Sequence, residues 1–317
     1  MISTDSQLNS MLLGVLALLL ASSIAAAVIC WRRVGDDEFR RNLVLRIASW
    51  WVLALIFSAA ASLGMAGLSI LFAFASFLAF REFVSLIATR RADHRALFWA
   101  FFFVIPLQYY LVYLQWYGLF AVFIPVYVAA ILPIRIVVAG DTQNFLERTA
   151  KIQWGLVSCV YFVSHVPALL MVPLRGGDGS AANLKLVLFL LIVVQLSDVF
   201  QYVWGKMIGR TPVAPSISPK KTVEGLIGGI ATAAAIGTLL HRVTPFTMIE
   251  AAQYSLLIAV AGFGGGLVMS AVKRDRGVKD FGELIPGHGG ILDRFDSICF
   301  AAPLLFHVVR FFHAADG

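Results

Sequence analysis

The sequence predicts an all-α fold, a polytopic integral membrane protein with about nine or ten transmembrane helices. Of its 317 residues, 60% are hydrophobic and 14% are charged, and the mean hydropathy is +0.85. Apolar stretches of roughly 17 residues or more recur along the chain, and each is long enough to cross the hydrocarbon core of a bilayer as a helix. This composition excludes an ordinary soluble domain.

The expected spans follow one another with short loops between them. Minimal turns separate the second span from the third and the fourth from the fifth, so nine spans remain an alternative to ten. The first span is too long for the apolar region of a cleavable signal peptide and ends in Trp-Arg-Arg, like a stop-transfer anchor. The approximate limits are 10–31, 43–62, 65–87, 97–116, 118–139, 153–173, 184–205, 225–241, 253–273 and 297–313.

Basic residues alternate between the two sides of the predicted bundle. Of the 25 Lys and Arg residues, 21 lie in or beside the loops that follow the first, third, fifth, seventh and ninth spans. The positive-inside rule places these five loops in the cytoplasm and both termini outside. A basic cytoplasmic face suits anionic lipids and nucleotides, although charges that serve topology alone explain most of these arginines.

The two halves of the chain differ in character. Residues 1–150 are spans joined by short arginine-bearing loops with few acids, and we interpret them as an N-terminal transmembrane scaffold. Residues 151–317 gather polar residues beside the spans, and we interpret them as the catalytic region, with cytoplasmic loops at 205–225 and 273–296.

The span 184–205 carries a carboxylate, Asp198, inside an apolar helix. An ionisable residue within a membrane span is costly and indicates a functional site by default. The alternative is a residue near the helix end that reaches the aqueous interface.

The loop that follows contains three prolines and the sequence SPKKT before the next span. The prolines favour an extended chain, and Thr222 is expected to cap the next helix, with Glu224 in its first turn. Lys220 and Lys221 stand just before this helix start, where ammonium groups and backbone N–H donors suit phosphate oxygens.

The segment 270–296 is the most charged part of the chain, with five basic residues, five acidic residues, one histidine and five glycines. Asp293 and Asp296 are three residues apart, so they share a face if they lie on a helix. Oxygen ligands of this kind suit Mg²⁺, and Asp280 is a candidate third ligand. A solvated charge cluster set by topology does not explain the Gly-His-Gly-Gly sequence around His288.

This segment, SAVKRDRGVKDFGELIPGHGGILDRFD, resembles the signature of CDP-diacylglycerol synthases (phosphatidate cytidylyltransferases), which reads S-x-x-K-R, four residues, K-D, then H-G-G-x-x-D-R-x-D. Upstream, Ser197-Asp198 with Tyr202 is similar to the S-D-x-x-A-Y helix of the family, and SPKKT with Glu224 is similar to its S-P-K-K-T-x-E-G loop. The resemblance is strong over 195–310 and general over the first half. The matching positions of the signature are Ser270, Lys273, Arg274, Lys279, Asp280, His288, Gly289, Gly290, Asp293, Arg294 and Asp296.

The resemblance implies an enzyme of phospholipid biosynthesis in a bacterial-type inner membrane, with active loops that face the cytoplasm. It would convert CTP and phosphatidate to CDP-diacylglycerol and pyrophosphate with Mg²⁺ as cofactor. The expected partners are CTP, phosphatidate and the bilayer, without nucleic acid, and a homodimer stays open. The residues expected to act in catalysis are Asp280, His288, Asp293 and Asp296, and those expected to bind the metal are Asp198, Asp280 and Asp293. The residues expected to bind substrate are Ser218, Lys220, Lys221, Ser270, Lys273, Arg274, Lys279 and Arg294.

The chain departs from the family pattern at one metal-site position. The family reads G-D-L-x-x-S before K-R, whereas this chain has Gly266 in place of that aspartate. Gln201 also replaces the alanine of the upstream helix. The departure predicts either metal binding through the remaining aspartates or a paralogue with altered substrate or activity.

Three other functions are alternatives to cytidylyl transfer. A non-catalytic or altered-substrate paralogue that binds phospholipid or nucleotide is the main alternative, because of Gly266. A transporter is disfavoured because the ionisable residues gather in loops rather than along a midplane pathway, apart from Asp198. The alcohol phosphatidyltransferases need a D-G…D…D pattern that the chain lacks.

Overall fold

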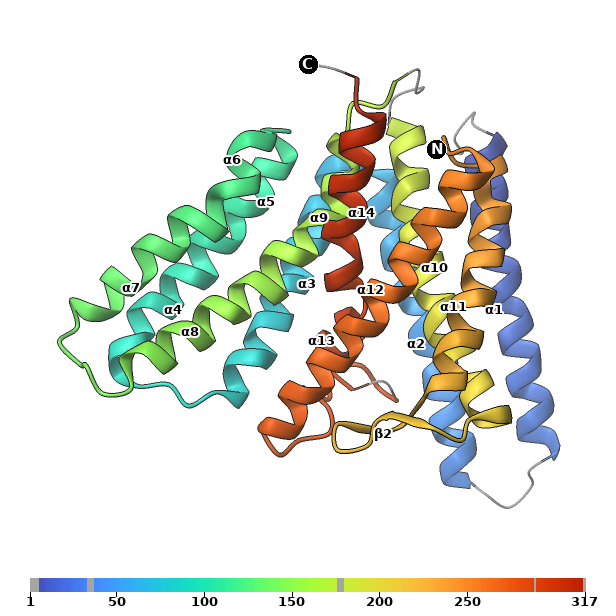
Figure 1. Ribbon diagram of the computed structural model, residues 1–317, viewed down its shortest axis with the longest axis horizontal. Helices are drawn as coiled ribbons and strands as arrows, with labels where there is room; N and C mark the ends of the chain where they lie inside the picture. The colour runs from blue at the N-terminus through green and yellow to red at the C-terminus, as the bar shows by residue number, and fades with distance from the viewer. Residues whose placement is uncertain (1–5, 33–36, 176–179, 288, 316–317) are drawn as a thin grey trace.

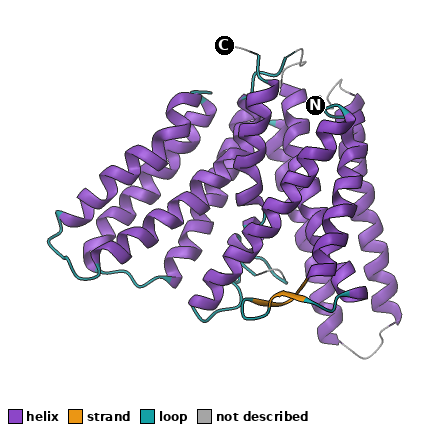
Figure 2. Cartoon of the chain, viewed as in Figure 1, coloured by secondary structure: helices purple, strands orange, loops and turns teal. Residues whose placement is uncertain are grey.

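The computed structural model describes residues 6–32, 37–175, 180–287 and 289–315. Most of the described chain is helical, and the two strands form one small hairpin (Figure 2). The N- and C-termini lie at one end of the helix bundle, and the hairpin lies at the other end (Figure 1).

Within the described residues, nine helical runs are long and apolar enough to cross a membrane, by length and composition. A tenth apolar helix is shorter. The predicted all-α polytopic fold with nine or ten spans is therefore confirmed. The runs that are continuous α-helices, together with the shorter one, are α1 (Ser6–Arg32), α2 (Asp37–Ser62), α3 (Gly64–Leu86), α10 (Ser180–Ile208), α11 (Val223–Leu239), α12 (Met248–Asp275) and α14 (Ile298–His313).

Three other spans are each interrupted by a π-helical turn. Their segments are α4 (His94–Trp99), η2 (Ala100–Val104) and α5 (Ile105–Tyr113), then α6 (Tyr117–Val122), η3 (Phe123–Val128) and α7 (Ala129–Val137), then α8 (Phe145–Leu156), η4 (Val157–Tyr161) and α9 (Phe162–Ala168). The remaining helical segments are short, namely η1 (Arg91–Asp93), η5 (Leu169–Met171), η6 (Leu240–Arg242) and α13 (Leu292–Phe295).

Prolines in the fifth span leave backbone carbonyls without a hydrogen-bond donor in their own helix. Side chains of a neighbouring span donate to these carbonyls instead. Pro125 has no N–H to donate to the carbonyl of Ala121, and the Tyr161 hydroxyl donates to that oxygen at 2.9 Å. Pro133 likewise leaves the carbonyl of Ala129 to the Gln153 amide, at 2.8 Å. Such side-chain donors make a proline tolerable where water is absent.

Small residues let α11 approach α10 and α12 closely. A Cβ atom on Gly225 would lie 2.7 Å from the Gln201 carbonyl oxygen, and one on Gly229 would lie 2.3 Å from the Gln201 side chain. On the next turns, a Cβ on Gly237 would lie 2.0 Å from the Ser255 hydroxyl. Close backbone approach through glycine is a common way to pack helices in membranes. It holds α10, which carries Asp198, beside α11 and α12.

The loop between α10 and α11 is an antiparallel hairpin of β1 (Pro212–Ala214) and β2 (Ser218–Thr222). The extended chain expected from its prolines is confirmed. The expected cap is confirmed as well, because the Thr222 hydroxyl accepts from Gly225 N at 3.2 Å. Glu224 accepts from Arg210 N at 3.0 Å and from Thr211 N at 3.1 Å, which fixes the start of the hairpin to the first turn of α11.

Candidate active site

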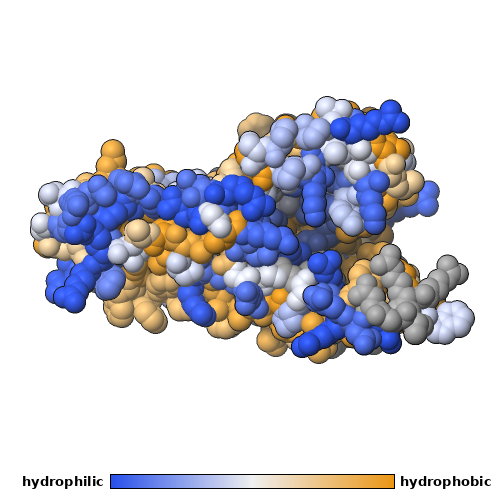
Figure 3. All heavy atoms as spheres, turned by 90° about the horizontal axis from the view of Figure 1, so that it is seen from below, coloured by the Kyte–Doolittle hydropathy of each residue, from blue (hydrophilic) through white to orange (hydrophobic). Residues whose placement is uncertain are grey.

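The charged loops gather at the end of the bundle that lies opposite the termini. This end carries the β1–β2 hairpin and the loop 276–291, which leads into α13 (Figure 1). Viewed from this side, hydrophilic residues extend across much of the surface (Figure 3). A polar end on an otherwise apolar bundle is where water-soluble and membrane substrates can meet.

Lys273 and Asp293 form an enclosed ion pair at this end. Lys273 Nζ lies 2.8 Å from Asp293 Oδ1, and the two side chains are 11% and 3% exposed. The other oxygen, Oδ2, accepts from Phe281 N at 2.8 Å and from Gly290 N at 3.0 Å. The Phe281 ring also faces the ammonium, at 5.2 Å from its centroid. Charge-assisted hydrogen bonds on both oxygens fix the Asp293 carboxylate in one orientation.

Asp280 stands across Gly289 from Asp293. A Cβ atom on Gly289 would lie 3.0 Å from Asp293 Oδ2 and 3.5 Å from Asp280 Cγ, so the two carboxylates flank the same glycine. Asp280 is exposed, whereas Asp293 is buried. His288, the histidine singled out from the sequence, lies outside the described residues.

A second charged group, a cluster of side chains, links three elements. It consists of Asp198 on α10, Lys221 on the hairpin, and Arg294 and Asp296 just before α14. Asp198 interacts electrostatically with Asp296, Lys221 and Arg294. Burial raises the pKa of Asp296, and the positive charges of Lys273, Lys221 and Arg294 oppose that rise. Burial lowers the pKa of Lys221, and Asp296 and Asp198 oppose that fall. Burial therefore outweighs the neighbouring opposite charges at both residues, although those charges offset part of its effect.

The residues expected to hold phosphates differ in their surroundings. Lys220 and Lys279 are exposed. Arg274 is also exposed, but its guanidinium donates to the carbonyls of Ile217 at 3.2 Å and Val278 at 3.0 Å, which ties the hairpin to the end of α12. Arg294 is partly buried, and its Nε has no hydrogen-bond acceptor among the described residues.

The two serines expected to bind substrate, Ser218 and Ser270, are both partly buried. Ser218 opens β2. The Ser270 hydroxyl donates to the Gly266 carbonyl at 2.6 Å, so its proton is already engaged within α12. What Ser270 offers a ligand is therefore its oxygen, as an acceptor.

Gly266 lies beneath the Lys221 ammonium. A Cβ atom at this position would lie 2.7 Å from Lys221 Nζ. Lys221 Nζ also lies 5.0 Å from the centroid of the Phe263 ring, one turn earlier on α12. The space where a side chain at position 266 would begin is therefore occupied by a cation.

The described residues contain no group of three or more His, Cys, Asp or Glu side chains placed to hold a metal ion. The carboxylates stand instead as two pairs, Asp198 with Asp296 and Asp280 with Asp293. Mg²⁺ commonly takes one or two carboxylates together with substrate phosphates, so pairs of oxygen donors fit this ion. The metal-ligand assignment stays a prediction.

The sequence did not point to three residues of α2 and α3 that contact the 286–292 backbone. Glu82 accepts from Ile291 N at 3.0 Å and from Leu292 N at 2.9 Å. Arg46 donates to the Gly287 carbonyl at 3.0 Å, and Ser49 donates to the Pro286 carbonyl at 2.9 Å. The signal that was available for Glu82 is a single carboxylate within an apolar span.

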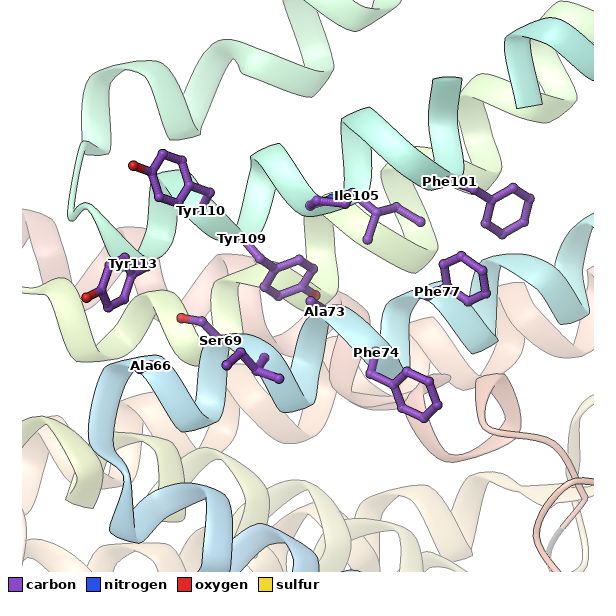
Figure 4. Close-up of a pocket in the computed structure, with 12 residues that line it drawn as sticks. Ala66, Ser69, Ala73, Phe74, Phe77, Phe101, Ile105, Tyr109, Tyr110 and Tyr113 are labelled. Carbon is purple, nitrogen blue, oxygen red and sulfur yellow. The ribbon is translucent and has the colours of Figure 1, made fainter. Parts of the chain in front are cut away.

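A separate groove is lined almost entirely by apolar and aromatic residues. Its volume is about 550 Å³, and it runs between α3 and α5, lined by aromatic residues such as Phe74, Phe77 and Tyr110 (Figure 4). The Tyr109 hydroxyl is bound to Ser76 at 2.6 Å. None of the charged residues described above lines this groove, so it is distinct from the polar end.

Comparison with known proteins assigns the chain to a family. Residues 44–312 match the model of the cytidylyltransferase family. The chain is 40% identical over 312 residues to the uncharacterized protein YnbB of Escherichia coli, an alignment that covers 96% of this chain and 99% of that protein. It is 47% identical over 115 residues to the phosphatidate cytidylyltransferase of Synechocystis and 41% identical over 132 residues to that of Bacillus subtilis. Those two alignments cover 36% and 41% of this chain and 39% and 49% of the two enzymes. The chain belongs to the cytidylyltransferase family.

Proposed function

We propose that this protein transfers the cytidylyl group of CTP to phosphatidate, which gives CDP-diacylglycerol and pyrophosphate. The observation that carries the proposal is the buried Lys273–Asp293 pair, placed beside the charged group of Asp198, Asp296 and Lys221 at the polar end. Family membership and the partial matches to proteins named phosphatidate cytidylyltransferase support the same reaction.

The reaction joins two anions. A phosphate oxygen of phosphatidate forms a bond to the α-phosphorus of CTP, and the bond from that phosphorus to the bridging oxygen of the β-phosphate breaks. Pyrophosphate leaves with the electron pair. Catalysis therefore consists mainly of bringing the phosphates together and offsetting their charge.

The side chains of the polar end fit these two tasks. Lys220 and Lys279 are exposed and placed to meet phosphates as they arrive. Lys273 supplies a buried positive charge whose position is fixed by Asp293. Bound Mg²⁺ would neutralise further phosphate charge, and the carboxylates that would hold it are Asp198 and Asp296, with Asp280 and Asp293 nearby.

The second candidate function is that of a non-catalytic or altered-substrate paralogue. Gly266 favours it, because a carboxylate expected from the family pattern is missing and the Lys221 ammonium occupies the adjacent space. The high identity to an uncharacterized protein over nearly the whole chain is compatible with either function.

One assay separates the two candidates. Purified protein is given labelled CTP, phosphatidate and Mg²⁺, and we expect labelled CDP-diacylglycerol. Absence of product, where a phosphatidate cytidylyltransferase such as that of Bacillus subtilis is active, would overturn the proposal. If the parent is inactive and Gly266→Asp restores activity while Gly266→Ala does not, the paralogue is the correct assignment. The alanine variant controls for displacement of Lys221 without a carboxylate.

We also propose that the polar end faces the cytoplasm of a bacterial-type inner membrane. The basic loops gather at this end, as the positive-inside rule requires of cytoplasmic loops. In a variant without the native cysteines, a cysteine at exposed Asp275 should react with a membrane-impermeant maleimide after cells are opened. A cysteine at exposed Met248, at the opposite end of α12, should react in intact cells. The reverse pattern would contradict the orientation.

A further inference from the structure

Glu82, a carboxylate from the N-terminal half of the chain, accepts hydrogen bonds from the backbone of the signature loop, the part of the 270–296 segment that leads into α13. Glu82 lies near the end of α3, and each of its two oxygens accepts one hydrogen bond from a consecutive backbone N–H, Ile291 N and Leu292 N. These donors are at the start of the short helix α13. Backbone N–H groups at a helix start have no partner within the helix, so an anion there satisfies them.

Two glycines of the loop make room for this carboxylate. A Cβ atom on Gly290 would lie 2.3 Å from one oxygen of Glu82, and a Cβ atom on Gly282 would lie 2.8 Å from the other. Neither glycine has a positive φ, unlike Gly287 and Gly289 in the same loop. Glycine at positions 282 and 290 is therefore explained by the space that Glu82 occupies rather than by backbone conformation.

Glu82 is linked to Asp293 through a short stretch of backbone. Leu292, which donates to Glu82, is fully buried and directly precedes Asp293. Gly290 N, one residue before the Glu82-bound amides, donates to Asp293 itself. Three successive amides, at 290, 291 and 292, are thus satisfied by two carboxylates of the protein. These three amides are therefore not available to substrate phosphates.

We propose that Glu82 is a positioning residue of the cytidylyltransferase site. By holding the start of α13 against α3, it sets the place of the Asp293 carboxylate and, through the 2.8 Å ion pair, of the Lys273 ammonium. Arg46 and Ser49 of α2 hold the carbonyls at 287 and 286, so the loop is fastened on both sides of Gly289. Only the activity measurement in the test of this inference depends on the proposed function.

The decisive variant is Glu82→Gln. Its side chain has the same length and shape, but one oxygen becomes an NH₂ group, which cannot accept a hydrogen bond from a backbone amide. We expect faster hydrogen–deuterium exchange confined to residues 286–296, and a fall in kcat of about tenfold or more with KM for CTP within about threefold. The matched control is Glu283→Gln, which removes the same charge from an exposed residue of the same loop and should change neither quantity.

The exchange measurement keeps this test separate from that of the proposed function. If the parent protein shows no cytidylyl transfer, the proposed function fails, but faster exchange at 286–296 in Glu82→Gln would still support the positioning role. Exchange and kcat both equal to those of the parent would overturn it. If Glu82→Gln fails to fold, Gly290→Ala provides the second route, because it displaces the carboxylate from the other side and should give the same local exchange. Unchanged exchange at 286–296 in Gly290→Ala would overturn the role as well.

Discussion

Lys273 of α12 and Asp293 of α13 form an ion pair of 2.8 Å that is almost closed to solvent. The pair joins a membrane helix to a loop that returns to the same end of the bundle. A buried pair is costly to assemble, so we interpret it as a fixed charge for substrate rather than as a source of stability.

We expect Asp293→Asn to abolish measurable turnover, with a loss on the order of 100-fold or more, because the variant removes the charge that fixes Lys273. The buried ammonium of Lys273 then loses its ion-pair partner at 2.8 Å, so thermal stability in detergent should fall as well. The double variant Lys273→Met/Asp293→Asn should recover much of that stability and none of the turnover. Near-normal turnover of Asp293→Asn would contradict the assigned role.

Asp198→Asn and Asp296→Asn are expected to raise the Mg²⁺ concentration needed for half-maximal activity, because each removes one of the two interacting carboxylates of the second charged group. A Mg²⁺ titration at saturating CTP measures this. Asp37→Asn is the control, since Asp37 is 94% exposed in its side chain and pairs with Arg40 on α2. A titration curve identical to that of the parent would remove these residues from the metal site.

Gly289→Ala tests the gap between Asp280 and Asp293. Gly289 has a φ of +80°, and its Cβ would lie 3.0 Å from Asp293 Oδ2. Gly277 offers a matched control, because it has a φ of +70° and open space around it. Both substitutions should cost roughly 1–2 kcal/mol of backbone strain, measured by thermal unfolding. Turnover should fall in Gly289→Ala alone. An equal loss in Gly277→Ala would show that strain, rather than contact with Asp293, is responsible.

Asp93→Asn is expected to destabilise the protein without altering the kcat of the folded fraction. Asp93 is fully buried and pairs with Arg148 at 3.2 Å, and Arg148 also donates to the Asp141 carbonyl at 2.8 Å. Removing the sole partner of a buried charge costs about 3–5 kcal/mol. Arg148 keeps the Asp141 carboxylate at 3.4 Å, so the expected cost is below that range. A thermal melt in detergent checks this, with Asp37→Asn as the exposed-pair control. Equal melting temperatures for the two variants would show that the buried pair contributes little.

The fold class could be predicted because hydropathy acts locally. Each span is recognised from its own residues. The alternation of basic loops then indicates which loops lie on the same side of the membrane. The π-helical turns in three spans were not predicted. Pro125 marks one of them in the sequence, but its cost depends on whether Tyr161, from another helix, reaches the released carbonyl. That pairing is a property of packing rather than of local sequence.

The candidate site was predicted in part for the same reason. The signature at 270–296 and the SPKKT hairpin are contiguous, so their polar residues were visible as patterns. Asp293 was expected to bind a metal, and the structure shows its two oxygens engaged by Lys273 and by backbone amides. The metal role of Asp293 stays a prediction.

By itself, the sequence determined that this is a multi-spanning helical membrane protein with its charges in alternate loops and a cytidylyltransferase signature in its second half. Only the tertiary structure decided that Glu82, Arg46 and Ser49, from spans interpreted as scaffold, hold the signature loop in place. It also decided that the Lys221 ammonium lies over Gly266. These contacts join residues far apart in the chain, and hydrogen-bond geometry between distant segments is set by helix packing, which no local pattern encodes.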